Sequence, residues 1–175
     1  MQADRIDPRT SAGMREVTLR GVELCRMAVE HCGYFKNHFA LVVGDHTEEF
    51  TLSRSAAAGS LSRILEEAHN EARERRAEVL FLLLQRRRAC RKEARQVEQW
   101  DSILAITQTR QRTAIALLPF RPRNPCIEFG ELETGECETE TFATPEVIFS
   151  KIGHVLDASM LEQPAKTRAA QAEWN

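Results

Sequence analysis

The sequence has little glycine and lacks the glycine-rich loops that hold phosphate groups. Eight glycines occur in 175 residues, and neither GxxxxGK[ST] nor GxGxxG is present. The patterns GxSxG, HExxH and the EF-hand loop are also missing, and Pro125-Cys126 is not followed by the second cysteine that a zinc deaminase needs. These absences argue against the well-marked enzyme classes, so we assign no catalytic residue and no cofactor.

Long hydrophobic runs are lacking too. The longest strictly apolar run is Val79–Leu84, whereas a helix needs about 20 apolar residues to span a bilayer. The first 13 residues contain Asp4, Arg5, Asp7 and Arg9 without an apolar stretch, which is not the pattern of a secretory signal. We therefore expect a cytoplasmic protein with no membrane partner.

Cysteine is too sparse and too irregular for a disulfide framework. The five cysteines are an odd number and include no CxxC pair, so we expect reduced thiols and assign no metal. Cys25 and Cys32 lie seven residues apart on a predicted helix, close in sequence to His31, His38 and His46. Core cysteines and surface histidines explain this pattern. A metal protein or unmarked enzyme around Cys25, Cys32, His38 and His46 is the alternative.

The spacing of apolar residues in the first part of the chain predicts a helix followed by a hairpin. Apolar residues fall largely at helical spacing from Met14 to Cys32, and Gly33 is well placed to end that helix. The β-rich run from Phe39 to Leu52 is broken by Gly44-Asp45-His46-Thr47, which favours strand, turn and strand.

Two more hairpins and a helix are expected in the second part. The hairpins cover about 103–119 and 127–142, and Thr144-Pro145-Glu146 has the residues of a helix start. The predicted order α-ββ-α-ββ-ββ-α indicates an α+β fold, with an antiparallel sheet of about four to six strands and helices on one face. Residues 14–161 are predicted to form a single domain, with flexible tails over 1–13 and 162–175.

The central part of the chain favours a long helix. No glycine or proline occurs from Ser60 to Leu118, and apolar residues recur at about every 3.6 residues as far as Gln99. One helix of about 40 residues would be roughly 60 Å long. The alternatives are a helical hairpin that turns near Gln85–Arg88, or a buried helical segment or interrupting strand at the apolar run Val79–Leu84. These apolar residues would form a stripe along one side of the helix, called the oligomer seam below, which needs a partner surface. We therefore expect a homo-oligomer that buries Leu61, Leu65, Val79, Leu83 and Val97.

Charge is segregated along the chain, although the net charge is only −2. Basic residues gather between Glu71 and Glu98, whereas Cys126 to Glu146 contains seven glutamates and no Lys or Arg. On a continuous helix, an arc of roughly 100° beside the seam would hold Arg73, Arg76, Arg87, Arg91 and Arg95. This arginine stripe fits a nucleic-acid backbone. It also fits arginines that lay their stems on the seam and keep their charges in water.

The glutamates of the last predicted hairpin form the opposite pole. Strand alternation would place Glu136, Glu138 and Glu140 on one face, and Glu131 and Glu133 extend this candidate acidic surface. Such a face fits a solubilised edge strand, a partner for the arginine stripe, or a surface that binds a basic protein.

These patterns predict a non-enzymatic protein that acts in protein–protein interaction, as a regulator or adaptor, through the long helix and the acidic hairpin. One alternative is a nucleic-acid-binding protein that uses the arginine stripe. Another is an acidic nucleic-acid mimic that inhibits a basic partner, and the third is the unmarked enzyme or metal protein described above.

Overall fold

An antiparallel sheet forms the centre of the computed structural model, which describes residues 6–52, 60–92, 96–123, 125–139 and 142. Its strands follow the order β2-β1-β3-β4-β5-β6, and β7 also pairs with β5. The helices are α1 (Ser11–Cys32) and α3 (Leu61–Glu74). The strands are β1 (His38–Val43), β2 (His46–Thr51), β3 (Val79–Lys92), β4 (Gln96–Thr109), β5 (Arg112–Arg123), β6 (Cys126–Phe129) and β7 (Glu133–Glu138). The predicted α+β class is confirmed, but the sheet has seven strands instead of the four to six expected.

Helix α1 begins and ends at residues suited to helix caps. The side chain of Thr10 accepts a hydrogen bond from the backbone N of Gly13 at 3.0 Å. Gly33 has a φ of 79°, and its N–H donates to the carbonyl of Val29 at 2.7 Å. The predicted helix and its end at Gly33 are confirmed, because glycine adopts this left-handed conformation without strain.

The predicted first hairpin is also confirmed. Strands β1 and β2 pair from His38 opposite Thr51 to Val43 opposite His46. Gly44, the first residue of the turn, has a φ of 58°, which a residue with a Cβ adopts less readily.

The predicted long helix is wrong, because α3 ends at Glu74. Arg76 takes a positive φ of 56°, and the N–H of Ala77 donates to the carbonyl of Ala72 at 2.8 Å. The N–H of Arg76 also donates to the carbonyl of Arg73 at 3.1 Å. This pattern is the Schellman ending, which usually places glycine where this chain has Arg76.

The run Val79–Leu84 is a strand, as one of the alternatives predicted. In β3, Leu80, Leu82 and Leu84 belong to one buried cluster, while Phe81 and Leu83 pack in another. Strand side chains alternate between faces, so a strand covered on both faces is apolar at every position. The run is apolar throughout because both faces of this strand are buried, and not because it forms the apolar stripe of a helix.

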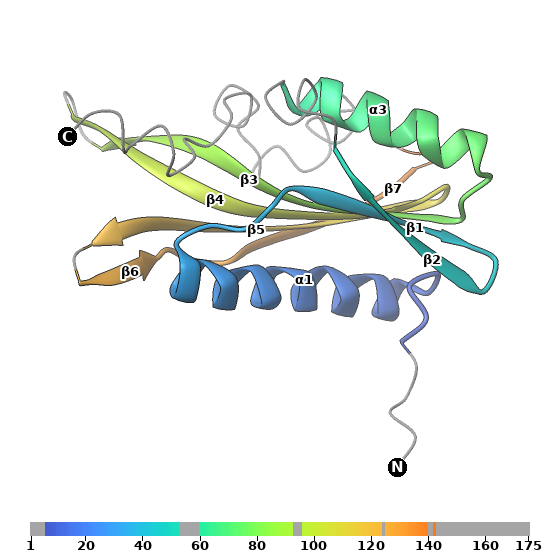
Figure 1. Cartoon of the computed structure of the whole chain (residues 1–175), viewed down its shortest axis with the longest axis horizontal. Coiled ribbons are helices and arrows are strands. Elements are labelled where there is room, and N and C mark those ends of the chain that lie inside the picture. Colours follow the sequence, from blue (N-terminus) through green and yellow to red (C-terminus); the bar gives the residue numbers. More distant parts are fainter. Residues whose placement is uncertain (1–5, 53–59, 93–95, 124, 140–141, 143–175) are drawn as a thin grey trace, which may run out of the picture.

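Helices cover both faces of the sheet, which corrects the prediction that they lie on one face. Figure 1 shows α1 below the sheet and α3 above it. The α3-side core contains Ile64, Leu65 and Ala68 with sheet residues such as Leu104. The α1-side core contains Val22, Cys25 and Val29 with Ile103, Ala105, Ala116, Leu118 and Phe120.

The second predicted hairpin, over 103–119, is confirmed by β4 and β5, but the last one is wrong. Strand β6 pairs with β5 over Phe120–Arg123, and β7 pairs with β5 over Arg112–Leu117. Both therefore lie along one edge of β5, and Thr134-Gly135 belongs to β7 instead of a turn. The predicted helix from Thr144, the C-terminal tail and the first five residues lie outside the described residues.

Candidate functional site

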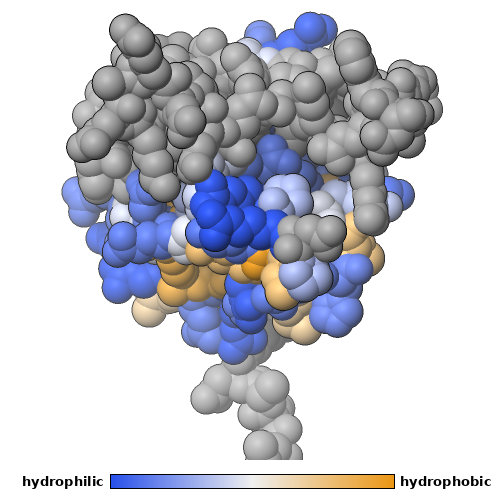
Figure 2. All heavy atoms as spheres, turned by 90° about the vertical axis from the view of Figure 1, so that its left-hand side faces the viewer, coloured by the Kyte–Doolittle hydropathy of each residue, from blue (hydrophilic) through white to orange (hydrophobic). Residues whose placement is uncertain are grey.

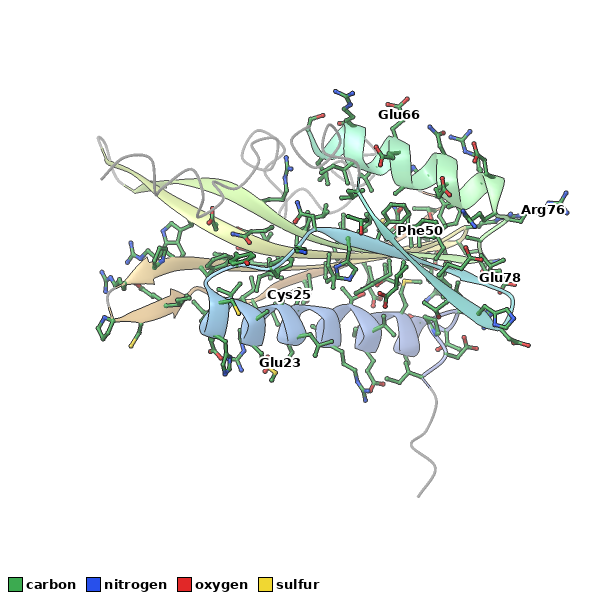
Figure 3. The ribbon with its side chains drawn as sticks, in the orientation of Figure 1. Glu23, Cys25, Phe50, Glu66, Arg76 and Glu78 are labelled. Carbon is green, nitrogen blue, oxygen red and sulfur yellow. The ribbon has the colours of Figure 1, made fainter. Side chains whose placement is uncertain are left out.

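The predicted arginine stripe does not lie on one element. Arg73 is in the last turn of α3, where its Nη2 donates to Asn70 Oδ1 at 2.8 Å, and Arg76 follows the helix. Figure 3 shows Arg76 at the end of the molecule where α3 meets β3. Arg87 and Arg91 belong to β3 by their backbone, but their side chains and all of Arg95 lie outside the described parts. The stripe requires one continuous helix, whereas α3 ends at Glu74 and β3 begins at Val79.

The predicted oligomer seam is core within this chain. Leu61 and Leu65 of α3 are buried on one side of the sheet, and Leu83 of β3 is buried on the other. Val79 is also buried, and the side chain of Val97 lies outside the described parts. The four described residues therefore need no second copy of the chain to cover them.

The candidate acidic surface is partly neutralised by other arginines. Glu136 of β7 accepts hydrogen bonds from Arg15 Nε at 2.9 Å and Nη2 at 3.1 Å. Glu138 lies opposite Arg112 in the sheet, with Arg112 Nη2 at 3.5 Å from Glu138 Oε1. Glu133 is also in β7, Glu131 precedes it, and Glu140 lies outside the described residues.

The candidate metal residues are not brought together. His38 and His46 lie at opposite ends of the β1–β2 hairpin. Cys25 points from α1 toward the sheet, and burial raises the pKa of its thiol to about 12 (Figure 3). Cys32, in contrast, is exposed. Within the described part of the chain, no three His, Cys, Asp or Glu residues group as a metal site.

A pocket of about 410 Å³ lies where α1 ends, and it is larger than three other pockets of about 310, 280 and 210 Å³. Its walls include the last turn of α1 with Tyr34, and the β5–β6 hairpin around Cys126. Gln85 of β3, Asp101 of β4 and Phe120 of β5 also line it. Because α1 stops at Cys32, the α1-side face of these strands continues into the open pocket.

Hydrogen bonds fix the polar residues of this α1-end pocket. Gln85 is buried, with 8% of its surface exposed. Its Nε2 donates to Asp101 Oδ2 at 3.3 Å, and its Oε1 accepts from the N–H of Phe35 at 3.3 Å. The N–H of Gln85 donates to Asn37 Oδ1 at 2.6 Å. The side chain of Gln85 thus positions the Asp101 carboxylate. Together with its backbone N–H, it also connects the segment after α1 to the sheet.

Exposed apolar side chains lead along α1 to the same pocket. Leu24 is 65% exposed, Met27 is 46% exposed and Tyr34 is 48% exposed. Leu24, Met27 and the pocket residue His31 are spaced three and four residues apart, so they share one face of the helix. Figure 2 views the left-hand end of Figure 1, and hydrophobic residues there form a band among hydrophilic ones.

Sequence reasoning missed Gln85, Asp101 and Tyr34 as site residues. Gln85 follows directly on the apolar run Val79–Leu84. A polar residue that extends a buried strand was the signal in the sequence, and the structure shows that Gln85 is buried. Asp101 and Tyr34 have no motif around them, and only the pairing of the strands brings them to the same pocket.

No protein-family model, curated protein or solved structure matches this chain. Among the described residues, neither helix is long and apolar enough to cross a membrane. The α1-end pocket and its surroundings therefore carry the functional argument alone.

Proposed function

We propose that this chain is a non-enzymatic binding protein whose protein partner docks at the α1-end pocket and along the outer face of α1. The observation that carries the proposal is the pocket itself, in which a buried amide holds a carboxylate beside the exposed ring of Tyr34. Interfaces between proteins have an apolar core rich in aromatic residues and a polar rim, and the exposed Leu24, Met27 and Tyr34 beside the Asp101 carboxylate can supply both.

A macromolecular partner fits better than a small molecule alone, because the exposed apolar groups extend beyond the pocket. Leu24 lies eight residues before Cys32, where α1 ends, which is about 12 Å along the helix. A ligand confined to the pocket would leave Leu24 and Met27 in water, whereas a partner surface would cover both.

The proposal keeps the predicted adaptor role and moves it to another surface. The long helix is absent, and the Glu136 and Glu138 carboxylates contact Arg15 and Arg112 of the same chain. A second copy of this chain is one candidate partner for the face that bears Leu24 and Met27. The compartment we propose remains the cytoplasm.

Affinity capture with matched surface variants tests this proposal. The full chain, Met27→Glu, Tyr34→Ala and the control Leu132→Glu are used as baits in extracts of the native host, with and without added nuclease. Leu132 is 45% exposed, nearly as much as Met27, but it lies between β6 and β7 and does not line the pocket.

We expect a nuclease-resistant protein partner that Leu132→Glu retains and that Met27→Glu and Tyr34→Ala lose by about tenfold or more. Retention of every partner by the Met27 and Tyr34 variants would contradict the proposed site. Recovery of nucleic acid alone would favour the nucleic-acid alternative.

A further inference from the structure

We propose that the chain binds a free α-amino acid with an aliphatic side chain in a second pocket, which lies between α1 and β7. This α1–β7 pocket has a volume of about 310 Å³ and shares no residue with the α1-end pocket. The inference goes beyond the proposed function and does not depend on it. The size of the pocket, its apolar floor and its two opposite charges each support it.

Small side chains leave this space between the helix and the sheet. Ala116 of β5 belongs to the α1-side core, and Ala114, two residues earlier, has the same orientation. In the register of β5 and β7 they lie opposite Thr134 and Glu136, and all four residues line the pocket. Because each alanine side chain is a single methyl group, the corner between α1, β5 and β7 stays open.

The floor of the α1–β7 pocket is apolar. Besides the two alanine methyl groups it contains Leu19 of α1, and the strand residues Ile115 and Gly135. The hydroxyl of Thr18 also lies there, but it is already 2.6 Å from Thr107 Oγ1. An aliphatic group placed on this floor would remove apolar surface of both the ligand and the protein from water.

The volume of the pocket limits the size of the ligand. Small-molecule sites in proteins are clefts of about 300–1,000 Å³, and this pocket is at the lower end of that range. A nucleotide or a large cofactor would extend out of it. A single amino acid has few enough atoms to be held within it.

One cation and one anion line the pocket. Arg15 and Glu136 are the charged residues among its nine lining residues. Arg15 donates to Glu136 from Nε at 2.9 Å and from Nη2 at 3.1 Å. The two side chains are 65% and 35% exposed, so a ligand in water can reach both. The pair has no net charge, so a ligand with one charge is attracted by one member and repelled by the other.

A zwitterion matches this ion pair without breaking it. A guanidinium has five N–H groups, and within the described part of the chain Nη1 of Arg15 has no acceptor, so a ligand carboxylate can bind there. Each oxygen of Glu136 accepts one bond from Arg15 and can accept another from a ligand ammonium. An α-amino acid carries both groups on one carbon, so opposite charges alternate around the site.

The test is an NMR titration of the full chain with free leucine. Three matched ligands each lack one of its groups: isocaproate lacks the ammonium, isoamylamine lacks the carboxylate, and serine lacks the aliphatic side chain. Each titration is repeated on three protein variants.

Thr134→Phe fills the pocket from an exposed position of β7, where an aromatic residue suits a strand. Arg15→Gln removes the cation. The control Arg20→Gln breaks another exposed ion pair of α1, with Glu16 at 2.6 Å, and lies outside the pocket. The signals of α3, on the other side of the sheet, show whether each variant is folded.

We expect leucine to shift residues 15–19, 114–116 and 134–136 and to leave α3 unchanged. Isocaproate, isoamylamine and serine should each bind at least about tenfold more weakly, because each lacks one of the three recognised groups. Affinity for leucine should fall about tenfold in Arg15→Gln. It should be lost in Thr134→Phe and unchanged in Arg20→Gln.

The absence of any shift at the solubility limit of leucine would overturn the inference. Equal affinity for leucine and any of the three matched ligands would also overturn it, because the missing group would then not be recognised. Unchanged binding in Thr134→Phe would place the site elsewhere, and equal losses in Arg15→Gln and Arg20→Gln would remove the role of Arg15. None of these results bears on the α1-end pocket, which the capture experiment tests separately.

Discussion

Two buried polar contacts join the helices to neighbouring residues of β4. On one face, Thr18 Oγ1 of α1 lies 2.6 Å from Thr107 Oγ1. On the other face, His69 Nε2 of α3 lies 2.7 Å from Gln108 Oε1. Buried polar groups are costly unless they are paired, so each contact favours one position of its helix on the sheet.

The buried His69 imidazole predicts a loss of stability in acid. Burial lowers its pKa and so does the charge of Arg73, while the hydrogen bond with Gln108 acts in the opposite direction. The pKa in the folded chain therefore lies below the unfolded value of about 6.5. The stabilising contribution is full above that value and is lost as the pH falls toward the folded pKa.

We expect the free energy of unfolding in urea to fall between pH 7.5 and pH 5, by at most about 1.4 kcal/mol per pH unit for this one proton. The fall should be smaller in His69→Gln, which keeps a donor for Gln108. An identical pH dependence in the variant and the parent chain would show that His69 is not the group responsible.

At the scale of elements, a helix end and a turn that contain glycine were predictable from the sequence, whereas the end of α3, which has no glycine, was not. Gly33 and Gly44 mark the end of α1 and the β1–β2 turn, and both were located from the sequence. Arg76 ends α3 in a conformation that glycine normally supplies, so nothing in its residue type marked the position. The helical spacing of apolar residues then continued by coincidence into a strand that is buried on both faces.

Replacing Arg76 by glycine should stabilise the chain. A left-handed conformation costs a residue with a Cβ about 1 kcal/mol, and glycine avoids that cost. We expect Arg76→Gly to raise the free energy of unfolding by about 0.5–1 kcal/mol in urea denaturation.

Arg73→Gly is the matched control, because Arg73 is an exposed arginine within the last turn of α3. Glycine inside a helix destabilises by about 1 kcal/mol. Opposite signs at the two positions support the observed helix end, and destabilisation at both would indicate a helix that continues past residue 76.

At the scale of the whole molecule, the site depends on strand pairing that the sequence does not reveal. Tyr34, Gln85, Asp101 and Phe120 come from four segments, and the register of β3, β4 and β5 brings the last three to one face. The α+β class, α1 and two of the hairpins follow from local patterns. The pocket does not, because one residue of slip in any strand would turn its side chain to the other face.

The position of Leu65 separates a core from an oligomer interface. Leu65 is fully buried within the chain, so Leu65→Ala should lower the free energy of unfolding by about 2–5 kcal/mol. Any dependence of the unfolding midpoint on protein concentration should be the same in the parent chain and in Leu65→Ala. The control Leu24→Ala, at an exposed position, should change stability by less than about 0.5 kcal/mol.

An unfolding midpoint that rises with protein concentration in the parent chain, and rises less in Leu65→Ala, would indicate that Leu65 lies in an oligomer interface. That result would contradict the assignment of Leu65 to the core of one chain.

The central claim is that the α1-end pocket is the binding site, and its own cysteines report on it most directly. Cys32 and Cys126 line the pocket and are exposed, Cys137 lies in β7 away from it, and Cys25 is buried. The measurement is the rate of maleimide labelling of each cysteine by peptide mass spectrometry, with and without a saturating amount of the partner recovered by affinity capture. Slower labelling of Cys32 and Cys126, with Cys137 unchanged and Cys25 unreactive throughout, is the predicted result. Unchanged rates at Cys32 and Cys126 under saturation would contradict the claim.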